Sequence, residues 1–526
     1  MTDIDYNNVL TENTFRFEGS FADDEKIPSQ LHNYKFGILN FKAITTTETK
    51  KDLDFIFTVD YSGSMSDICS DGRTKIQHII HTLKNMILFL HKNTSVNVNI
   101  SVNIFNNKIY KIIKRVKIND NNLDNLLTKI DTIKPEGGTN IENALDKSFK
   151  YIQELKTNYP ENLISHIFMT DGEATDGSDE ISLLKGLVVD DVFNAFIGFG
   201  IDHDAGLLNS IASVGKSSYY FIDKLESSGL IYGEILHSII YKILIDCELQ
   251  LTNGLVYDFK TNSWVQNLKI CDIISESNKT YNVISENPDY FTANIHGKNE
   301  GSDTMLTYPS KRLPDTDLSN HCFRQRTLQL LFEVNQFLSN QRKPINMHWK
   351  MLFMNYMDQY SDSTTHNIKE QKNTIKKKLA SFMEEMKKFM SENQLTDDKF
   401  MKNLCDDIYI CFRTFDTKYG NMFCSARQTS QGSQRLYTVS NTDFDTNSDT
   451  TSDTDIPFRH LQGTLPPPPP RLRRARNYED SIVPDYITIS QHQTSDFCDT
   501  PYLTPQATQV MKYVSSDDQD NTTTTN

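Results

Sequence analysis

The chain has 526 residues, with 54 Lys and Arg against 69 Asp and Glu, a net charge of −15 and a pI near 5.4. This length exceeds what one ordinary hydrophobic core serves, so we expect two or three domains with linkers. The acidic balance argues against a general binder of nucleic acid or of an anionic membrane surface.

The N-terminal residues and the cysteines favour an intracellular location. The acidic start, Met1–Tyr6, lacks the basic-then-apolar order of a signal peptide, and no stretch has the run of about 20 apolar residues that a membrane helix needs. The eight cysteines are scattered without a Cys-x-x-Cys pair, which fits neither a zinc ribbon nor a disulfide framework. We therefore predict a reducing compartment, the cytoplasm.

The first 50 residues are expected to contribute one strand. Residues 1–33 are polar and mixed, and we predict that they are irregular. Residues 34–44 alternate like a strand and lie outside the domain that follows. Residues 45–51 are a connector into that domain.

A buried strand at Phe55–Val59 ends in a group of oxygen-bearing side chains. Asp60, Ser62 and Ser64 follow at alternate positions, and Gly63 allows the backbone to turn sharply. In open α/β sheets ligands bind at the carboxyl ends of the strands, and hard cations such as Mg²⁺ take oxygen ligands. Taken alone, the string fits an Asp and Ser turn that caps the next helix equally well.

Two later stretches favour the cation. Thr139 follows a Gly pair at the start of a helical pattern, and residues 164–170 form a second buried strand that ends at Asp171. Together with Asp60, Ser62 and Ser64, these residues resemble the metal-ion-dependent adhesion site of the von Willebrand factor type A family, over roughly residues 50–246.

That resemblance implies a site for Mg²⁺ or Mn²⁺. It further implies that Asp60 and Asp171 act mainly through ordered water, whereas Thr139 contacts the ion directly in one state. Two carboxylates would balance the ion's charge, but most direct ligands would be neutral hydroxyls. The ion would therefore stay electrophilic and incompletely coordinated, which suits a carboxylate from another molecule.

The loop at residues 65–73 departs from the usual family pattern, because helix periodicity begins only near Thr74. We expect Asp67 and Asp71 to lie on the rim of the site and to repel indiscriminate anions. His78 and His81 lie one turn apart and could suggest a metal pair. Without a third ligand nearby, a solvated helix face is the better interpretation.

Strands and helices alternate over residues 51–246, which predicts an α/β domain with a doubly wound, mostly parallel sheet. The expected strands lie at 96–104, 109–118, 164–170, 192–199 and 219–222, and the expected helices at 74–92, 123–130, 141–155, 180–186, 205–214 and 225–245. Residues 247–315 change to a period of two, typical of a small β-sandwich that residues 34–44 would join. This layout is similar to that of inter-alpha-trypsin inhibitor heavy chains.

The C-terminal part divides into helices and a tail. Residues 316–425 are predicted to form a helical domain, with helices near 322–338, 345–360, 369–393 and 398–415. Residues 426–526 are rich in Thr, Ser, Asp, Gln and Pro, which predicts disorder. Within them, Pro466–Arg471 fits an SH3-type ligand, with a stiff basic spacer as the competing interpretation. Residues 500–511 carry enough apolar side chains for a short docking motif.

These patterns predict a non-enzymatic adaptor that binds an Asp or Glu side chain of a protein partner through its metal. A phosphatase-like hydrolase is the first alternative. Such enzymes of the haloacid dehalogenase type carry Asp-x-Asp, whereas Ser62 holds the second position here and does not titrate near neutral pH. A purely structural scaffold with an empty site is the other alternative.

Overall fold

The computed structural model describes residues 6, 8–19, 33–46, 49, 51–69, 71–200, 202–222, 228–299, 304–340, 361–415, 418–434 and 504–515. All of these belong to one compact unit, formed by residues 1–438 and 500–526. The helix expected at 345–360 and the Pro466–Arg471 element lie outside the described residues.

The α/β domain is built on a six-stranded sheet. Its order is β5-β4-β3-β6-β7-β8. The strands are β3 (Leu53–Asp60), β4 (Val98–Phe105), β5 (Ile109–Lys117), β6 (Leu163–Thr170), β7 (Phe193–Phe199) and β8 (Ser217–Ile222). Every pairing is parallel except that of β4 with the lysine-rich edge strand β5. The predicted doubly wound, mostly parallel sheet is confirmed.

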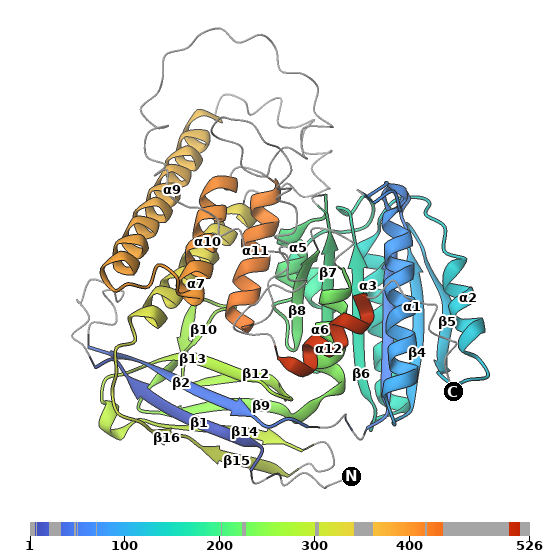
Figure 1. Ribbon diagram of the computed structural model, residues 1–526. Helices are drawn as coiled ribbons and strands as arrows, with labels where there is room; N and C mark the ends of the chain where they lie inside the picture. The colour runs from blue at the N-terminus through green and yellow to red at the C-terminus, as the bar shows by residue number, and fades with distance from the viewer. Residues whose placement is uncertain are drawn as a thin grey trace, which may run out of the picture. The chain divides into compact units, whose positions relative to one another are not determined.

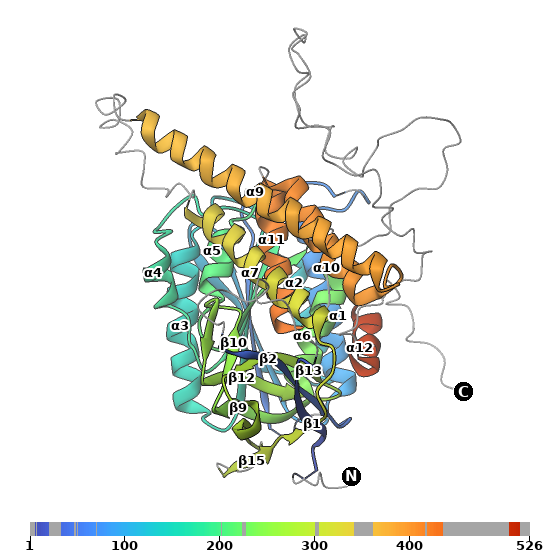
Figure 2. The ribbon, with the colours of Figure 1, turned by 90° about the vertical axis from the view of Figure 1, so that its left-hand side faces the viewer.

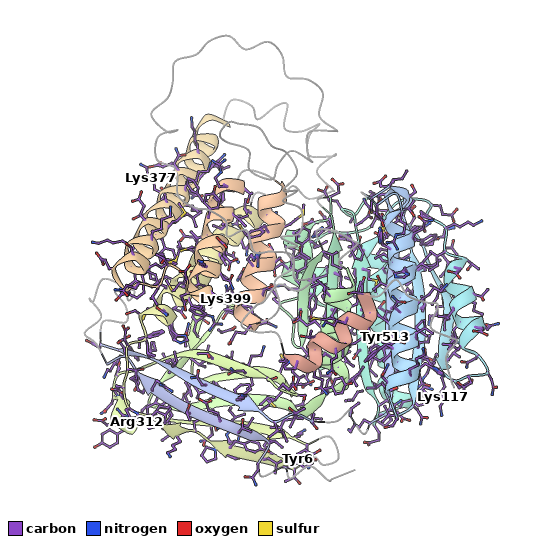
Figure 3. The ribbon with its side chains drawn as sticks, in the orientation of Figure 1. Tyr6, Lys117, Arg312, Lys377, Lys399 and Tyr513 are labelled. Carbon is purple, nitrogen blue, oxygen red and sulfur yellow. The ribbon has the colours of Figure 1, made fainter. Side chains whose placement is uncertain are left out.

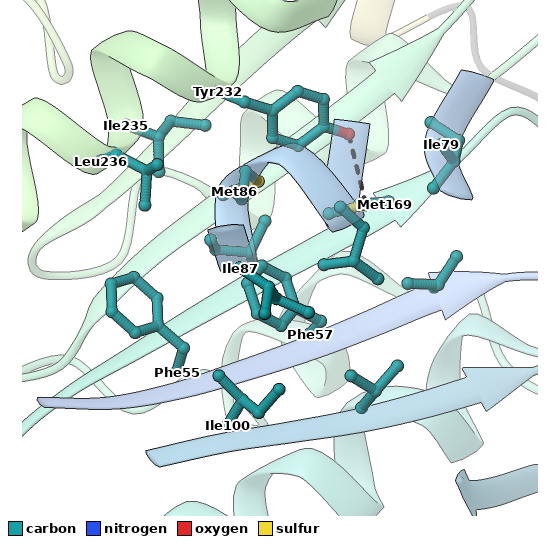
Figure 4. Close-up of a cluster of buried hydrophobic side chains, with 14 of the residues drawn as sticks. Phe55, Phe57, Ile79, Met86, Ile87, Ile100, Met169, Tyr232, Ile235 and Leu236 are labelled. Carbon is teal, nitrogen blue, oxygen red and sulfur yellow. Dashed lines mark hydrogen bonds between the residues drawn. The ribbon is translucent and has the colours of Figure 1, made fainter. Parts of the chain in front are cut away.

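Helices cover both faces of this sheet (Figures 1 and 2). One face carries α1 (Lys75–Asn93), α2 (Leu123–Asp131) and α6 (Ser228–Ile240), and the other carries α3 (Ile141–Asn158), α4 (Ile181–Lys185) and α5 (Ala205–Ile211). The first face packs Phe55 and Phe57 of β3 against Ile87 of α1 and Ile235 of α6 (Figure 4). Because β3 is buried on both faces, all eight of its residues are buried and most of them are apolar.

The predicted helix at 225–245 is wrong at its C-terminal end. Helix α6 stops at Ile240, and β9 (Lys242–Thr252) begins two residues later. The residues after Ile240 form a short run that is apolar apart from Lys242 and fits a helix or a strand by periodicity alone. Ile243 and Leu244 pack in the β-sandwich core, so tertiary burial decides for the strand. The expected domain boundary after residue 246 therefore falls inside β9.

Two sheets pack face to face in the β-sandwich. One has the order β11-β10-β13-β2-β1-β16 and the other β12-β9-β14-β15. Their further strands are β1 (Leu10–Phe17), β2 (Lys35–Ala43), β10 (Leu255–Asp258), β11 (Ser263–Val265), β12 (Asn267–Ile274), β13 (Asn278–Ser285), β14 (Thr292–Lys298), β15 (Met305–Pro309) and β16 (Lys311–Arg312). The aromatic rings of Phe15 and Phe17 lie 4.8 and 5.1 Å from that of Phe291, in the core between the sheets.

The chain enters the sandwich twice, before and after the α/β domain. Strand β2 pairs antiparallel with β13 over eight residue pairs, which confirms that the early strand joins strands from 247–308. The prediction that residues 1–33 are irregular is wrong for β1. Only Phe15 and Phe17 of β1 are buried, so the alternation of apolar and polar residues is too short to predict a strand.

A buried ion network ties the α/β domain to the sandwich. Asp272 of β12 accepts bonds from Lys216 Nζ (2.9 Å) and Lys242 Nζ (2.8 Å). Burial alone would raise the pKa of the Asp272 carboxyl, but the charges of Lys242 and Lys216 together hold that pKa well below its ordinary value. Lys216 precedes β8, so this carboxylate connects the two domains.

Helices α7 (Ser319–Asn340), α9 (Ser361–Glu392), α10 (Lys399–Thr414) and α11 (Lys418–Ser433) form the predicted helical part (Figure 1). Helix α11 continues past residue 425, so disorder from 426 onward is wrong for its last residues. Polar contacts order them: Gln431 Nε2 donates to Asp407 Oδ2 (2.7 Å), and Arg427 pairs with the same carboxylate. Disorder is also wrong for Pro505–Ser515, which form helix α12.

No helix within the described part of the chain combines the length and apolarity needed to cross a membrane.

Charged side chains such as Lys117, Lys377 and Lys399 extend outward from strands and helices alike (Figure 3).

Candidate metal centre

The site starts where β3 and β6 end side by side. Because these strands are parallel neighbours, Asp60 and the Thr170–Asp171 pair meet at one edge of the sheet. The Asp60 carboxylate is fully buried and both its oxygens accept hydrogen bonds, from the backbone N–H of Ser62 (2.8 Å) and the hydroxyl of Thr170 (2.6 Å). These bonds fix the orientation of the carboxylate.

A tight turn brings two hydroxyls beside the second carboxylate. Ser62 precedes a short 3₁₀ helix (Gly63–Ser66), which turns the chain back over the end of β3. The hydroxyl oxygens of Ser62 and Ser64 lie 3.2 Å apart, and Ser64 Oγ donates to Asp171 Oδ1 (2.8 Å). The backbone N–H of Gly63 donates to the carbonyl of Gly137 (3.0 Å), which joins this turn to the loop that carries Thr139.

The Thr139 loop is held from two sides. Gly137 has a φ of +79°, and a Cβ there would lie 2.8 Å from Asn106 Nδ2, so a larger residue does not fit. The backbone N–H of Thr139 donates to Thr175 Oγ1 (2.8 Å). A Cβ on Gly172 would lie 3.6 Å from Thr139 Oγ1 and 3.9 Å from Ser64 Oγ, so these hydroxyls flank the same small space. The structure thus brings all five predicted residues together.

The two carboxylates of this group, Asp60 and Asp171, make the site favourable for a cation. Burial raises the pKa of the Asp60 carboxyl to about 6, against the hydrogen bonds from Ser62 and Thr170, and the nearby Asp171 carboxylate adds to the increase. Both carboxylates are completely buried, and every other predicted ligand is a neutral hydroxyl. An all-oxygen set of this kind fits Mg²⁺ or Mn²⁺. The described residues contain no cluster of three or more His, Cys, Asp or Glu suited to a metal, and this site has two such residues, Asp60 and Asp171.

Sequence reasoning missed one residue of the site, Lys75. Its Nζ lies 2.8 Å from Asp171 Oδ2 and 3.1 Å from Asp67 Oδ2, and its side chain is 15% exposed. Burial would lower the pKa of Lys75, but bonds with Asp171 and Asp67 raise it overall. Lys75 is the first residue of α1, where the helix dipole disfavours a cation. That unusual placement is the signal by which it could have been found.

The loop at 65–73 does not present free negative charge. Asp67 pairs with Lys75, and Asp71 accepts bonds from Arg73 Nε (2.6 Å) and His78 Nε2 (3.1 Å). The expectation that these two aspartates repel anions therefore loses its basis. The expected solvated face is wrong for His78, which is buried because it closes this loop onto α1.

A cavity of about 190 Å³ lies elsewhere, where the sandwich meets α6 and α12. Its lining includes Lys216, His237, Asp272, Tyr281 and Met511, and none of the five predicted ligands. The candidate metal centre lies instead at the carboxyl ends of β3 and β6.

Comparison with known proteins agrees with the fold. A family model for the von Willebrand factor type A domain matches residues 54–233. A search of curated protein sequences finds no match. The similarity of layout to inter-alpha-trypsin inhibitor heavy chains stays a prediction.

Several solved structures are similar. A von Willebrand factor type A protein from Catenulispora acidiphila has 12% identity and a TM-score of 0.42, with 57% of this chain and 75% of that chain covered. The ArnB paralog VWA2 from Sulfolobus acidocaldarius has 15% identity and a TM-score of 0.43, with coverages of 76% and 94%. Proximal thread matrix protein 1 from the mussel byssus, with a zinc-occupied MIDAS motif, has 18% identity and a TM-score of 0.27, with coverages of 35% and 46%.

Proposed function

Because residues 54–233 form a von Willebrand factor type A domain, we propose that this chain is a metal-dependent protein-binding adaptor. Asp60, Ser62, Ser64, Thr139 and Asp171 hold Mg²⁺ or Mn²⁺. The site binds an Asp or Glu side chain presented by a protein partner.

One observation carries this proposal: two buried carboxylates and three hydroxyls, from three separate segments, converge at the carboxyl end of the sheet. A bound divalent ion would supply a Lewis-acidic position to an incoming carboxylate. Gly172 keeps the space beside Thr139 and Ser64 free of a side chain. Asp60 is buried and accepts bonds at both oxygens, so it orients its neighbours and does not serve as an accessible base.

The second candidate is a structural scaffold that works without metal. The ion pair between Lys75 and Asp171 favours it, because an internal ammonium already offsets one of the two carboxylates. The two candidates differ in what becomes of the ion pair between Lys75 and Asp171, and experiment can separate them on this point. In the adaptor a divalent ion shares or replaces the bond of Lys75, whereas in the scaffold Lys75 keeps it.

We also propose an intracellular location and an SH3-type partner for Pro466–Arg471. Cys247, Cys271, Cys405, Cys411 and Cys424 carry free thiols, which suits a reducing compartment. The SH3 proposal rests on the sequence alone.

Affinity capture from source cells tests the adaptor. The bait is the full chain, with and without a metal chelator, beside Thr139→Ala and Ser66→Ala. Ser66 is the matched control, because its hydroxyl donates to the Gly63 carbonyl in the same turn but belongs to no ligand set. The adaptor predicts partners that are lost with chelator and with Thr139→Ala and kept with Ser66→Ala. Partners unaffected by all three treatments would favour the scaffold.

A further inference from the structure

Helix α12 (Pro505–Ser515) packs against the α/β domain, between α6 and α1 (Figures 1 and 3). Its buried residues are Ala507, Val510, Met511 and Val514, at the i, i+3, i+4 and i+7 spacing of a single helix face. Val510 and Val514 belong to the same apolar cluster as the sheet and α1. A segment far from the domain in sequence thus completes its core.

The surface of α6 is shaped for this close approach. A Cβ on Gly233 would lie 2.5 Å from the Cα of Met511, and a Cβ on Gly229 would lie 2.6 Å from the Cα of Ser515. Glycine inside a helix costs about 1 kcal/mol relative to alanine. Two such glycines one turn apart on α6 are explained by the helix that lies on them. We call the surface of α1 and α6 on which α12 lies the α12 groove.

Polar contacts at both ends set the position of the helix. At its start, Gln506 Nε2 donates to the carbonyl of Thr46 (3.2 Å), and the Gln506 backbone N–H donates to Glu276 Oε2 (3.0 Å). At its end, Asn85 Nδ2 of α1 donates to the carbonyl of Val514 (3.0 Å). The ring of Tyr513 packs edge-on against Phe89, with centroids 5.3 Å apart (Figure 3 labels Tyr513). The groove therefore recognises helix length and register as well as apolar area.

The connection of α12 to the rest of the chain is long. Residues 434–504 separate it from the end of α11. An isolated helix of this length is marginal in water, so the groove supplies most of the stability of α12. Helix α12 therefore depends on α1 and α6 as a bound amphipathic helix depends on the groove that holds it.

We propose that the α12 groove is a second protein-binding site, and that α12 is its built-in competing ligand. The partner that fits is an amphipathic helix with residues of Ala to Met size at i, i+3, i+4 and i+7. Such a helix has to displace α12, which competes with an advantage because it belongs to the same chain. This proposal does not depend on the metal centre, because none of the groove residues belongs to it.

A labelled peptide of residues 500–518 provides the test, titrated into the full chain by fluorescence anisotropy. Met511→Asp in the chain weakens its own α12, so the wild-type peptide should bind this variant at least about 10-fold more tightly than the wild-type chain. Adding Gly233→Leu to that variant fills the groove and should abolish binding. Gln509→Asp, on the exposed face of α12, is the matched control and should behave like wild type.

Three results would overturn the proposal. One is an absence of peptide binding to Met511→Asp while its thermal unfolding stays cooperative. Another is equal peptide affinity for wild type and Met511→Asp. The third is a concentration-dependent dimer of the wild-type chain that Gly233→Leu removes in sedimentation, because α12 would then be exchanged between copies.

Discussion

The ammonium of Lys75 lies 2.8 Å from the buried carboxylate of Asp171, at the position where a divalent ion would draw on the same charge. In the proposed adaptor, an ion and this side chain would compete for one carboxylate. Lys75 would therefore set how tightly the site holds a metal and how stable it is without one.

Lys75→Met should raise metal affinity and lower the stability of the metal-free chain. Removing the competing cation should tighten Mg²⁺ binding about 10-fold, while the unpaired Asp171 costs on the order of 3 kcal/mol without metal. Calorimetry and thermal unfolding with and without Mg²⁺ measure both effects. Lys84→Met is the control, because Lys84 lies on the same helix but pairs with the half-exposed Asp131. Unchanged or weaker Mg²⁺ binding by Lys75→Met would show that the two cations do not compete.

Substitutions at Gly172 should close the metal site in proportion to their size. Its missing Cβ already lies 3.6 Å from Thr139 Oγ1, an ordinary contact distance. Gly172→Ala should therefore keep metal binding, whereas Gly172→Leu should abolish it with little change in far-ultraviolet circular dichroism. Full metal binding by Gly172→Leu would place the ion elsewhere.

Asp272→Ala should destabilise the junction of the α/β domain and the sandwich. It leaves Lys216 and Lys242 without their shared buried carboxylate, which costs about 3–5 kcal/mol. Asp246→Asn is the matched control, because Asp246 has a φ of +54°, which Asn tolerates better than Ala. Asp246 pairs with the same Lys216, but its side chain is 46% exposed, so its loss should cost less than about 1 kcal/mol. Urea denaturation of the two variants measures both losses of stability. Equal midpoints would refute the stabilising role of Asp272 at the junction.

Stability should fall as the pH drops from about 6.5 to 4. Burial lowers the pKa values of His166, His203, His237 and His321 to about 4. The unfolded chain takes up these protons first, so the histidines contribute fully above the unfolded pKa and lose their contribution as the pH approaches 4. Asp60 and Asp406, whose pKa values burial raises to about 6, act in the opposite direction and offset part of the loss.

Urea midpoints at pH 7 and pH 5 check this dependence. His166→Gln should reduce the difference between the two midpoints, because the folded chain then excludes one proton fewer. His296→Gln, at a surface position where His296 bonds Thr307 and Gln250, should leave that difference unchanged. A wild-type midpoint that is equal or higher at pH 5 would contradict the prediction.

The convergence of the five oxygen side chains was predictable from the resemblance to the type A family, and only partly from topology. Topology places the ends of two parallel strands, and with them Asp60 and Asp171, at the same edge of a doubly wound sheet. The pairing of β2 with β13 was predictable for a similar reason, since both alternate and neither fits the α/β pattern.

The features that sequence reasoning missed depend on contacts distant in the chain. Helix α12 is too short to be stable alone and forms because α6 offers Gly229 and Gly233 beneath it. The end of α11 is polar in composition, and its order comes from bonds such as that of Gln431 to Asp407. For Lys75 the sequence offers one signal, a cation at the start of a helix, and its role becomes clear only because α1 starts beside Asp171.

Calorimetric titration of Mg²⁺ and Mn²⁺ into the full chain tests the central claim most directly. The account predicts one bound ion for wild type and for Ser66→Ala, and no measurable binding for Asp60→Ala and Ser62→Ala while both variants unfold cooperatively. Equal metal uptake by all four proteins, or none by wild type, would contradict it.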